Sequence, residues 1–108
     1  MMLTERQLVK RQKELESELR RLFTLLRKTE LLEDIEIKIA SGQGFMCTQK
    51  ELSLTEEGLV ETEVDTDPDF YNRRERKLTK RDLSRIAREY RKILKPEKIR
   101  SICRRLSL

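Results

Sequence analysis

The chain has 108 residues, of which 42% are charged and 36% are hydrophobic, and its formal net charge is +5. This length allows one small domain, and because an average globular protein has only about 25% charged residues, we expect a thin core. Histidine is absent, which excludes a Ser-His-Asp triad and histidine-ligated zinc, and two cysteines are too few for a zinc cage or a disulfide framework.

The sequence predicts one α+β domain over residues 1–108 that is mainly α. We expect a long N-terminal heptad helix at 4–31 and a small antiparallel β element of two or three strands within 34–66. We also expect two basic helices within 73–108.

The first expected element is the long helix over residues 4–31. Thr4 followed by Gln7 is typical of an N-cap with its capping-box partner, and no glycine or proline interrupts the stretch. Five leucines recur at heptad a and d positions and are interpreted as a dimer interface: Leu8, Leu15, Leu19, Leu22 and Leu26. The alternatives are packing within the monomer alone or packing against the C-terminal helices as well.

The second expected element is a β hairpin over Ile35–Thr48. Isoleucines alternate with charged residues from Ile35 to Ile39, as in a half-buried strand. Residues 41–44, Ser-Gly-Gln-Gly, are predicted to form the turn, with a second strand at 45–48 and a third at 59–64. The turn lacks the helix and lysine of a P-loop, so we expect no phosphate cradle there.

Residues 51–72 contain eight acidic and no basic side chains, a net charge of −8. We interpret this segment as a solvated, partly disordered acidic loop. The spacing of Asp65, Asp67 and Asp69 resembles the opening of a calcium loop, but the later glycine and glutamate are missing, so we expect no metal site. An alternative is autoinhibition, in which deletion of 55–69 would tighten polyanion binding.

Residues 73–108 carry fifteen basic and four acidic side chains, a net charge of +11. Thr79 followed by Asp82 indicates a helix start, and the pair at 95–96, Lys-Pro, indicates its end before a second short helix. On the first helix, apolar residues share one side and cations form a line on the other. Residues 73–77 are predicted to be a flexible basic arm.

These cations predict contacts to a phosphate backbone. Arginine outnumbers lysine ten to five in 73–108, and guanidinium groups can bind phosphate bidentately. The predicted contact residues are Arg73, Arg74, Arg81, Arg85, Arg88, Lys92, Lys95 and Arg104. The sequence therefore predicts a dimeric, non-catalytic nucleic-acid-binding protein with a regulatory or architectural role, for DNA or RNA.

The alternatives are a protein-interaction adaptor or inhibitor, with the acidic loop and the basic helix as docking surfaces, and a solvated surface without a ligand. No apolar run approaches the about 20 residues of a membrane span, and no secretory leader pattern opens the sequence. We therefore expect no membrane partner, no cofactor and a cytoplasmic location, with the nucleoid or the nucleus as variants.

Overall fold

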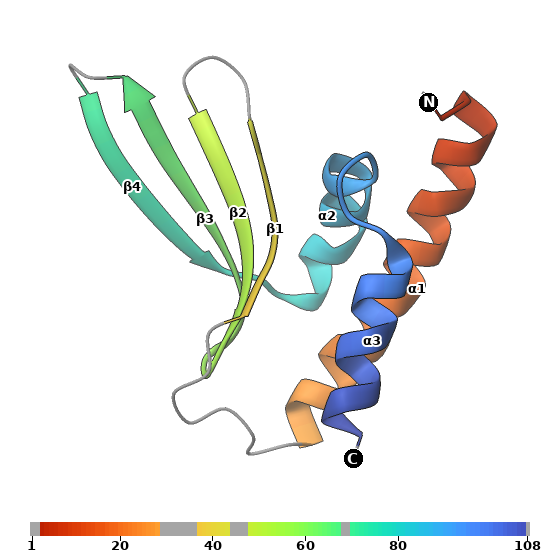
Figure 1. Ribbon diagram of the computed structural model, residues 1–108. Coiled ribbons are helices and arrows are strands. Elements are labelled where there is room, and N and C mark those ends of the chain that lie inside the picture. Colours follow the sequence, from red (N-terminus) through yellow and green to blue (C-terminus); the bar gives the residue numbers. More distant parts are fainter. Residues whose placement is uncertain (1–2, 29–36, 44–47, 68–69, 108) are drawn as a thin grey trace. The chain divides into compact units, whose positions relative to one another are not determined.

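The computed structural model of the protein describes residues 3–28, 37–43, 48–67 and 70–107 (Figure 1). These residues belong to two compact units. The helical unit comprises Met1–Leu31 and Thr79–Leu108, and the sheet unit comprises Leu32–Leu78. The chain is an α+β protein, as predicted, in which both outer parts of the sequence build one unit and the middle builds the other. That 1–108 forms a single domain stays a prediction.

The helix α1 spans Glu5–Lys28 and begins where the sequence predicts. The backbone N–H of Thr4 donates to Oε1 of Gln7 at 2.8 Å, and the N–H of Gln7 donates to Oγ1 of Thr4 at 3.2 Å. This reciprocal capping box satisfies two N–H groups near the helix start. The predicted last residues of the helix, 29–31, lie outside the described residues.

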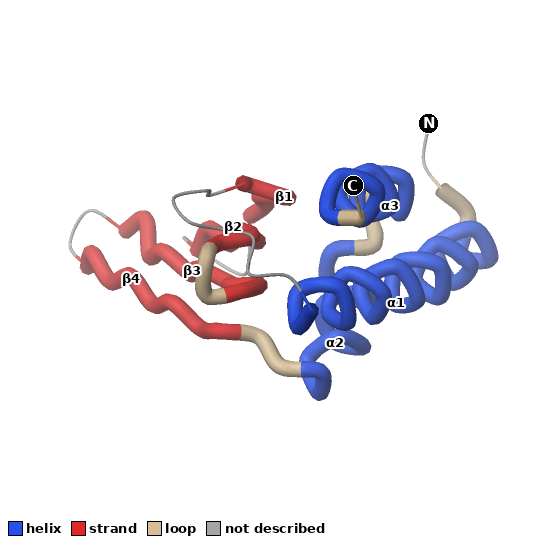
Figure 2. The backbone as a smooth tube through the Cα atoms, turned by 90° about the horizontal axis from the view of Figure 1, so that it is seen from below, coloured by secondary structure: helices blue, strands red, loops and turns tan. Residues whose placement is uncertain are grey.

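Two shorter helices, α2 (Leu83–Tyr90) and α3 (Pro96–Leu106), pack against α1 in the helical unit. Figures 1 and 2 both show α1 beside α3. The core takes leucines and isoleucines from all three helices and from the segment between α2 and α3, among them Leu15, Leu19, Leu22, Leu83, Ile86, Leu94 and Ile99, each 0% exposed. The apolar face of α1 therefore packs against the C-terminal helices, which is one of the arrangements that the sequence left open.

The basic helix predicted over 79–95 is interrupted. The chain forms a 3-10 turn, η1 (Lys80–Asp82), and then α2, which ends at Tyr90. Lys95 is extended, with φ −88° and ψ 137°, because the ring of Pro96 disfavours the α conformation for the residue before it. The chain therefore leaves the first helix early and enters a new one at Pro96, so the cations do not continue along one helix.

The sheet unit is a four-stranded antiparallel sheet with strand order β1-β2-β3-β4 (Figure 1). Its strands are β1 (Ile37–Gln43), β2 (Thr48–Thr55), β3 (Gly58–Asp67) and β4 (Phe70–Lys77). The antiparallel element and the strand predicted at 59–64 are confirmed. The sheet has four strands instead of the two or three expected.

Two segments predicted as turn and loop are strands. Ser41, Gly42 and Gln43 continue β1 and pair with β2, so the predicted turn does not form there. The predicted strand at 45–48 contributes Thr48 to β2, while 45–47 lie outside the described residues. Most of the acidic segment 51–72 lies in β2 and β3, and deleting 55–69 would remove all of β3.

The basic arm predicted at 73–77 is also a strand, β4. The register places Arg74 opposite Glu63 and Arg76 opposite Glu61. Opposite charges on directly facing residues stabilise an antiparallel pair. The arginines of the arm and the acids of the predicted loop are therefore neighbours in one sheet.

The β2–β3 hairpin depends on Gly58, whose φ is +115°. The N–H of Glu57 donates to Oγ1 of Thr55 at 3.2 Å, and that hydroxyl donates to the carbonyl oxygen of Gly58 at 3.3 Å. The Thr55 side chain thus spans the turn. Residues with a β carbon rarely adopt such a φ, so the turn selects glycine.

Gly58→Ala is expected to lower the free energy of unfolding of the sheet unit by about 1–2 kcal/mol. An added β carbon would come no closer than 3.8 Å to Cε of Lys77, so the cost is conformational rather than steric. Urea denaturation followed by the amide signals of β2 and β3 measures it. Gly42→Ala in β1 is the control and should be neutral or slightly stabilising. Equal destabilisation by both changes would contradict this explanation.

Candidate nucleic-acid interface

The helical unit carries the positive charge of the chain. Residues 1–31 and 79–108 include nineteen lysines and arginines and eight acidic residues, a net charge of +11. The sheet unit, residues 32–78, has six basic and twelve acidic residues, a net charge of −6. The net positive charge of the chain is therefore concentrated in the helical unit, and the sheet unit is acidic.

Few cations of the helical unit are neutralised within it. Within the described part of the chain, the closest ion pairs in this unit join Arg20 to Glu16 at 3.0 Å, Arg85 to Glu89 at 3.0 Å and Arg100 to Glu18 at 3.1 Å. Twelve exposed lysines and arginines among the described residues of the unit have no ion pair: Arg6, Lys10, Lys13, Arg21, Lys80, Arg81, Arg88, Lys92, Lys95, Lys98, Arg104 and Arg105. These charges are available to an external anion.

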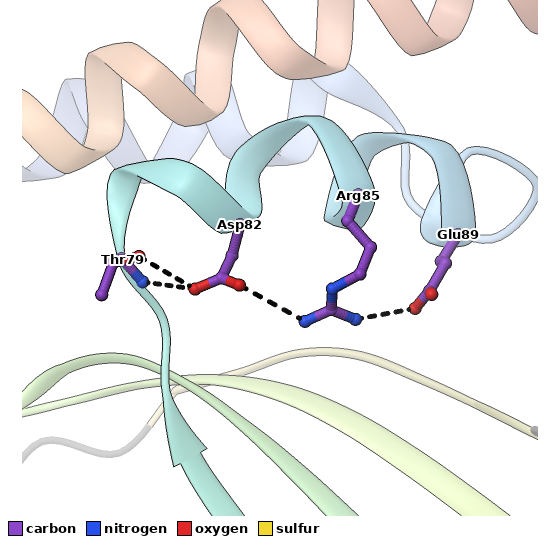
Figure 3. A network of polar contacts seen from close by, with 4 residues as sticks. All are labelled: Thr79, Asp82, Arg85 and Glu89. Atoms are coloured by element: carbon purple, nitrogen blue, oxygen red, sulfur yellow. Dashed lines mark hydrogen bonds and ion pairs between the residues drawn. The ribbon is translucent and has the colours of Figure 1, made fainter.

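Arg85 is held by Glu89 of its own helix, α2, and by Asp82, the last residue of η1 (Figure 3). Its Nη1 lies 3.0 Å from Oε2 of Glu89, and its Nη2 lies 3.9 Å from Oδ1 of Asp82. Oδ2 of Asp82 accepts hydrogen bonds from the backbone N–H of Thr79 at 2.7 Å and from its hydroxyl at 3.1 Å. These contacts confirm the predicted helix start. They also engage Arg85, one of the predicted phosphate contacts, inside its own unit.

The other predicted contact residues are exposed but lie on different elements. They are Arg81 on η1, Arg88 on α2, Lys92 in the turn after α2, Lys95 before α3 and Arg104 on α3. Arg73 and Arg74 lie on β4 in the sheet unit, where Nη2 of Arg73 is 2.8 Å from Oε1 of Glu75. Six of the eight predicted residues thus belong to the helical unit, and two belong to the sheet unit.

The outer face of α1 carries a second row of cations, which the sequence interpretation missed. Arg6, Lys10 and Lys13 follow each other at spacings of four and three residues, and all three are exposed. At about 100° per residue they lie on the side of the helix opposite Leu15 and Leu19. The sequence did contain a signal for this row, because its three cations occupy heptad positions other than a and d. Interpreting α1 as a dimerisation helix left these cations without a role.

Side-chain hydrogen bonds hold α1 against both neighbouring helices. Ser84 Oγ donates to Glu16 Oε1 at 2.7 Å, Arg91 Nη1 donates to Gln12 Oε1 at 3.0 Å, and Arg100 Nε donates to Glu18 Oε1 at 3.1 Å. The first bond comes from α2, the second from the turn that follows it and the third from α3. Together with the leucines, these bonds fix the helices and thus the spacing of the cations that they carry.

The pKa of the Glu16 carboxyl lies below its ordinary value of 4.5, because hydrogen bonds from the Ser84 hydroxyl and then from Arg20 favour the charged form. A carboxyl with a lowered pKa in the folded state stabilises the fold above its unfolded-state pKa. That contribution is lost as the pH falls through the folded-state pKa.

Glu16→Gln is therefore expected to lose less stability than the wild type as the pH falls from about 5 to about 3. The measurement is urea denaturation at a series of pH values. Glu14→Gln, which alters an exposed side chain of the same helix, is the control. If the stability of Glu16→Gln depends on pH in the same way as that of the wild type, the Glu16 carboxyl does not contribute to the acid sensitivity of the fold.

The leucine stripe predicted to pair two subunits is covered within one chain. Leu15, Leu19 and Leu22 are 0% exposed, Leu8 is 8% exposed, and Leu26 is half-buried. An interface formed by these leucines would require α1 to separate from α2 and α3. A homodimer stays a prediction, but these side chains are not an exposed surface.

Cys103 is a buried thiol on α3. It is 0% exposed, and burial raises the pKa of its thiol, with Arg21 opposing and Glu18 adding to the shift. A raised pKa keeps the reactive thiolate scarce at neutral pH. Cys103 therefore serves as a small apolar side chain of the core.

Comparison of the chain with protein-family models, curated proteins and solved structures found no match. Among the described residues, no helix combines the length and the apolar character that crossing a membrane requires. The same residues include no group of three or more His, Cys, Asp or Glu side chains placed to hold a metal ion.

Proposed function

We propose that this protein binds nucleic acid without catalysing a reaction and that its helical unit contacts the phosphate backbone. The observation that carries the proposal is the net charge of +11 on this unit, with exposed cations that have no ion pair among the described residues. Each phosphate that such a cation neutralises releases condensed counterions, which favours binding. The role is regulatory or architectural.

Two groups of cations serve this binding. One is the outer row of α1, Arg6, Lys10 and Lys13. The other is the C-terminal group, namely Arg81, Arg88, Lys92, Lys95 and Arg104. Both groups contact phosphates, and phosphate contacts do not distinguish one base sequence from another directly. We therefore propose weakly specific binding, with Arg85 contributing less because Asp82 and Glu89 hold it.

Fluorescence anisotropy titrations of the purified protein with labelled duplex and single-stranded oligonucleotides test the proposal. The logarithm of the binding constant should fall linearly with the logarithm of the salt concentration, with a slope of about −0.9 per phosphate contact for a duplex and about −0.7 for a single strand. Parallel DNA and RNA duplexes show which nucleic acid is preferred. Binding that does not respond to salt, or no binding at low salt, would contradict the proposal.

A second candidate function is a protein-interaction adaptor or inhibitor. The net charge of −6 on residues 32–78 supports it, because this acidic unit suits a basic protein partner. A pull-down that survives nuclease treatment and returns one stoichiometric protein would favour it over nucleic-acid binding. Light scattering of the purified protein gives its molar mass and so shows whether it is the predicted homodimer.

A further inference from the structure

The sheet unit contains a cavity of about 220 Å³ that the proposed nucleic-acid binding does not use. Ser53 on β2 and Val60 and Thr62 on β3 line it from the same face of the sheet, because Ser53 pairs with Val60, and Thr62 lies two residues further along β3. Small-molecule sites usually measure about 300–1,000 Å³. This cavity therefore suits a single long side chain better than a cofactor.

Two hydroxyl groups in the cavity have no partner. Ser53 is 5% exposed and Thr62 is 7% exposed, and neither side chain has a hydrogen bond within the described chain. Thr55 also lines the cavity, but its hydroxyl is engaged by the turn. Neither oxygen is sealed from solvent, so both hydroxyls can accept a hydrogen bond from a group that enters the cavity.

The remaining polar lining selects for positive charge. Glu56 and Glu57 stand on the β2–β3 turn at the edge of the cavity, exposed and, within the described residues, without an ion pair. On β4, Glu75 is already neutralised by Arg73, since Nη2 and Oε1 are 2.8 Å apart. The lining as a whole has three carboxylates and one guanidinium, a net charge of −2. An anion would be repelled here and a cation attracted.

We propose that this cavity binds the guanidinium group of an arginine side chain presented by a partner peptide. A guanidinium has five N–H donors in one plane, and the Ser53 and Thr62 hydroxyls and the nearby carboxylates offer several acceptors. An ammonium has three donors and is more strongly hydrated, so a lysine would leave acceptors unused and cost more to desolvate. The Val60 side chain contacts the aliphatic part of the arginine. This binding is independent of the proposed nucleic-acid binding.

The probe is acetyl-Gly-Arg-Gly-amide, titrated into the ¹⁵N-labelled full chain and followed by amide chemical shifts. Shifts should concentrate at the β2–β3 turn and at Ser53, Thr62 and Glu75. The peptide with lysine in place of arginine should bind at least about threefold more weakly. The peptide with citrulline, which has the shape of arginine without its charge, should bind at least about tenfold more weakly.

Two variants separate this site from general attraction to an acidic unit. Thr62→Val removes one hydroxyl and keeps the shape of the side chain. It should weaken binding of the arginine peptide at least about fivefold. The double change Glu56→Gln and Glu57→Gln alters only exposed turn residues and should weaken it similarly. Ser41→Ala, an exposed hydroxyl on β1 outside the cavity, is the matched control and should leave binding unchanged.

Three results would overturn the proposal. The first is the absence of shifts at the cavity residues, and the second is equal binding of the arginine and citrulline peptides. The third is binding that neither Thr62→Val nor the double glutamine variant changes while both remain folded by their amide spectra. Loss of oligonucleotide binding would leave this result untouched, because the two sites lie in different units.

Discussion

Leu19→Ala is expected to lower the free energy of unfolding of the helical unit by about 3 kcal/mol, within the about 2–5 kcal/mol typical of such changes. Leu19 is 0% exposed, and it lies on the face of α1 that packs against α2 and α3. Alanine keeps the helix propensity, so the loss reports the removed apolar contacts and the cavity left behind. Urea denaturation followed by circular dichroism at the helix band measures it.

Val9→Ala is the control, because Val9 belongs to the same helix but is 41% exposed. It should change the free energy of unfolding by no more than about 0.5 kcal/mol. The same experiment tests the dimer prediction, because a leucine seam between subunits makes stability depend on protein concentration. Leu19→Ala stability close to that of Val9→Ala would contradict the packing of α1 within its own chain.

Neutralising Arg81, Arg88 and Lys92 together by glutamine is expected to weaken duplex binding by about 100-fold or more at about 100 mM salt. Each lost phosphate contact removes about 0.9 from the salt slope, so the slope should become shallower by about 2–3. All three side chains are exposed, and glutamine is well tolerated in helices, so the fold should persist. Anisotropy titrations over a range of salt concentrations measure both quantities.

The matched control neutralises Arg73, Arg74 and Lys77 on β4, which removes an equal number of positive charges from the sheet unit. Its affinity and salt slope should stay close to those of the wild type. If the β4 variant loses as much affinity as the helical variant, net charge rather than the helical surface governs binding. A third variant that neutralises Arg6, Lys10 and Lys13 shows whether the outer row of α1 takes part.

The helix starts could be predicted because they depend on neighbours in the sequence. Thr4 with Gln7 and Thr79 with Asp82 are pairs three residues apart, and their hydrogen bonds form within one turn. The apolar spacing likewise placed Leu19 on a buried face. What the leucines pack against is a long-range question. The heptad spacing favoured a partner chain, whereas in the structure α1 packs against α2 and α3 of the same chain.

The sequence analysis predicted too few strands, because strand pairing depends on which residues face each other across the sheet and not on the local sequence pattern. Residues 73–77 have no apolar alternation, so they look like a solvated arm, yet Arg74 and Arg76 face Glu63 and Glu61 across the ladder. The same register explains why an acidic segment is ordered. The cavity was beyond prediction for a similar reason, because Ser53 and Thr62 become neighbours only when β2 and β3 pair.

The separated halves of the helical unit have a consequence for synthesis of the protein. The leucines of α1 are translated before the helices that cover them, because α2 and α3 follow the whole sheet unit in the chain. At about 5–20 residues per second, the apolar stripe of the nascent chain stays uncovered for several seconds. During that interval, α1 exposes an apolar stripe that α2 and α3 cover once they have been translated.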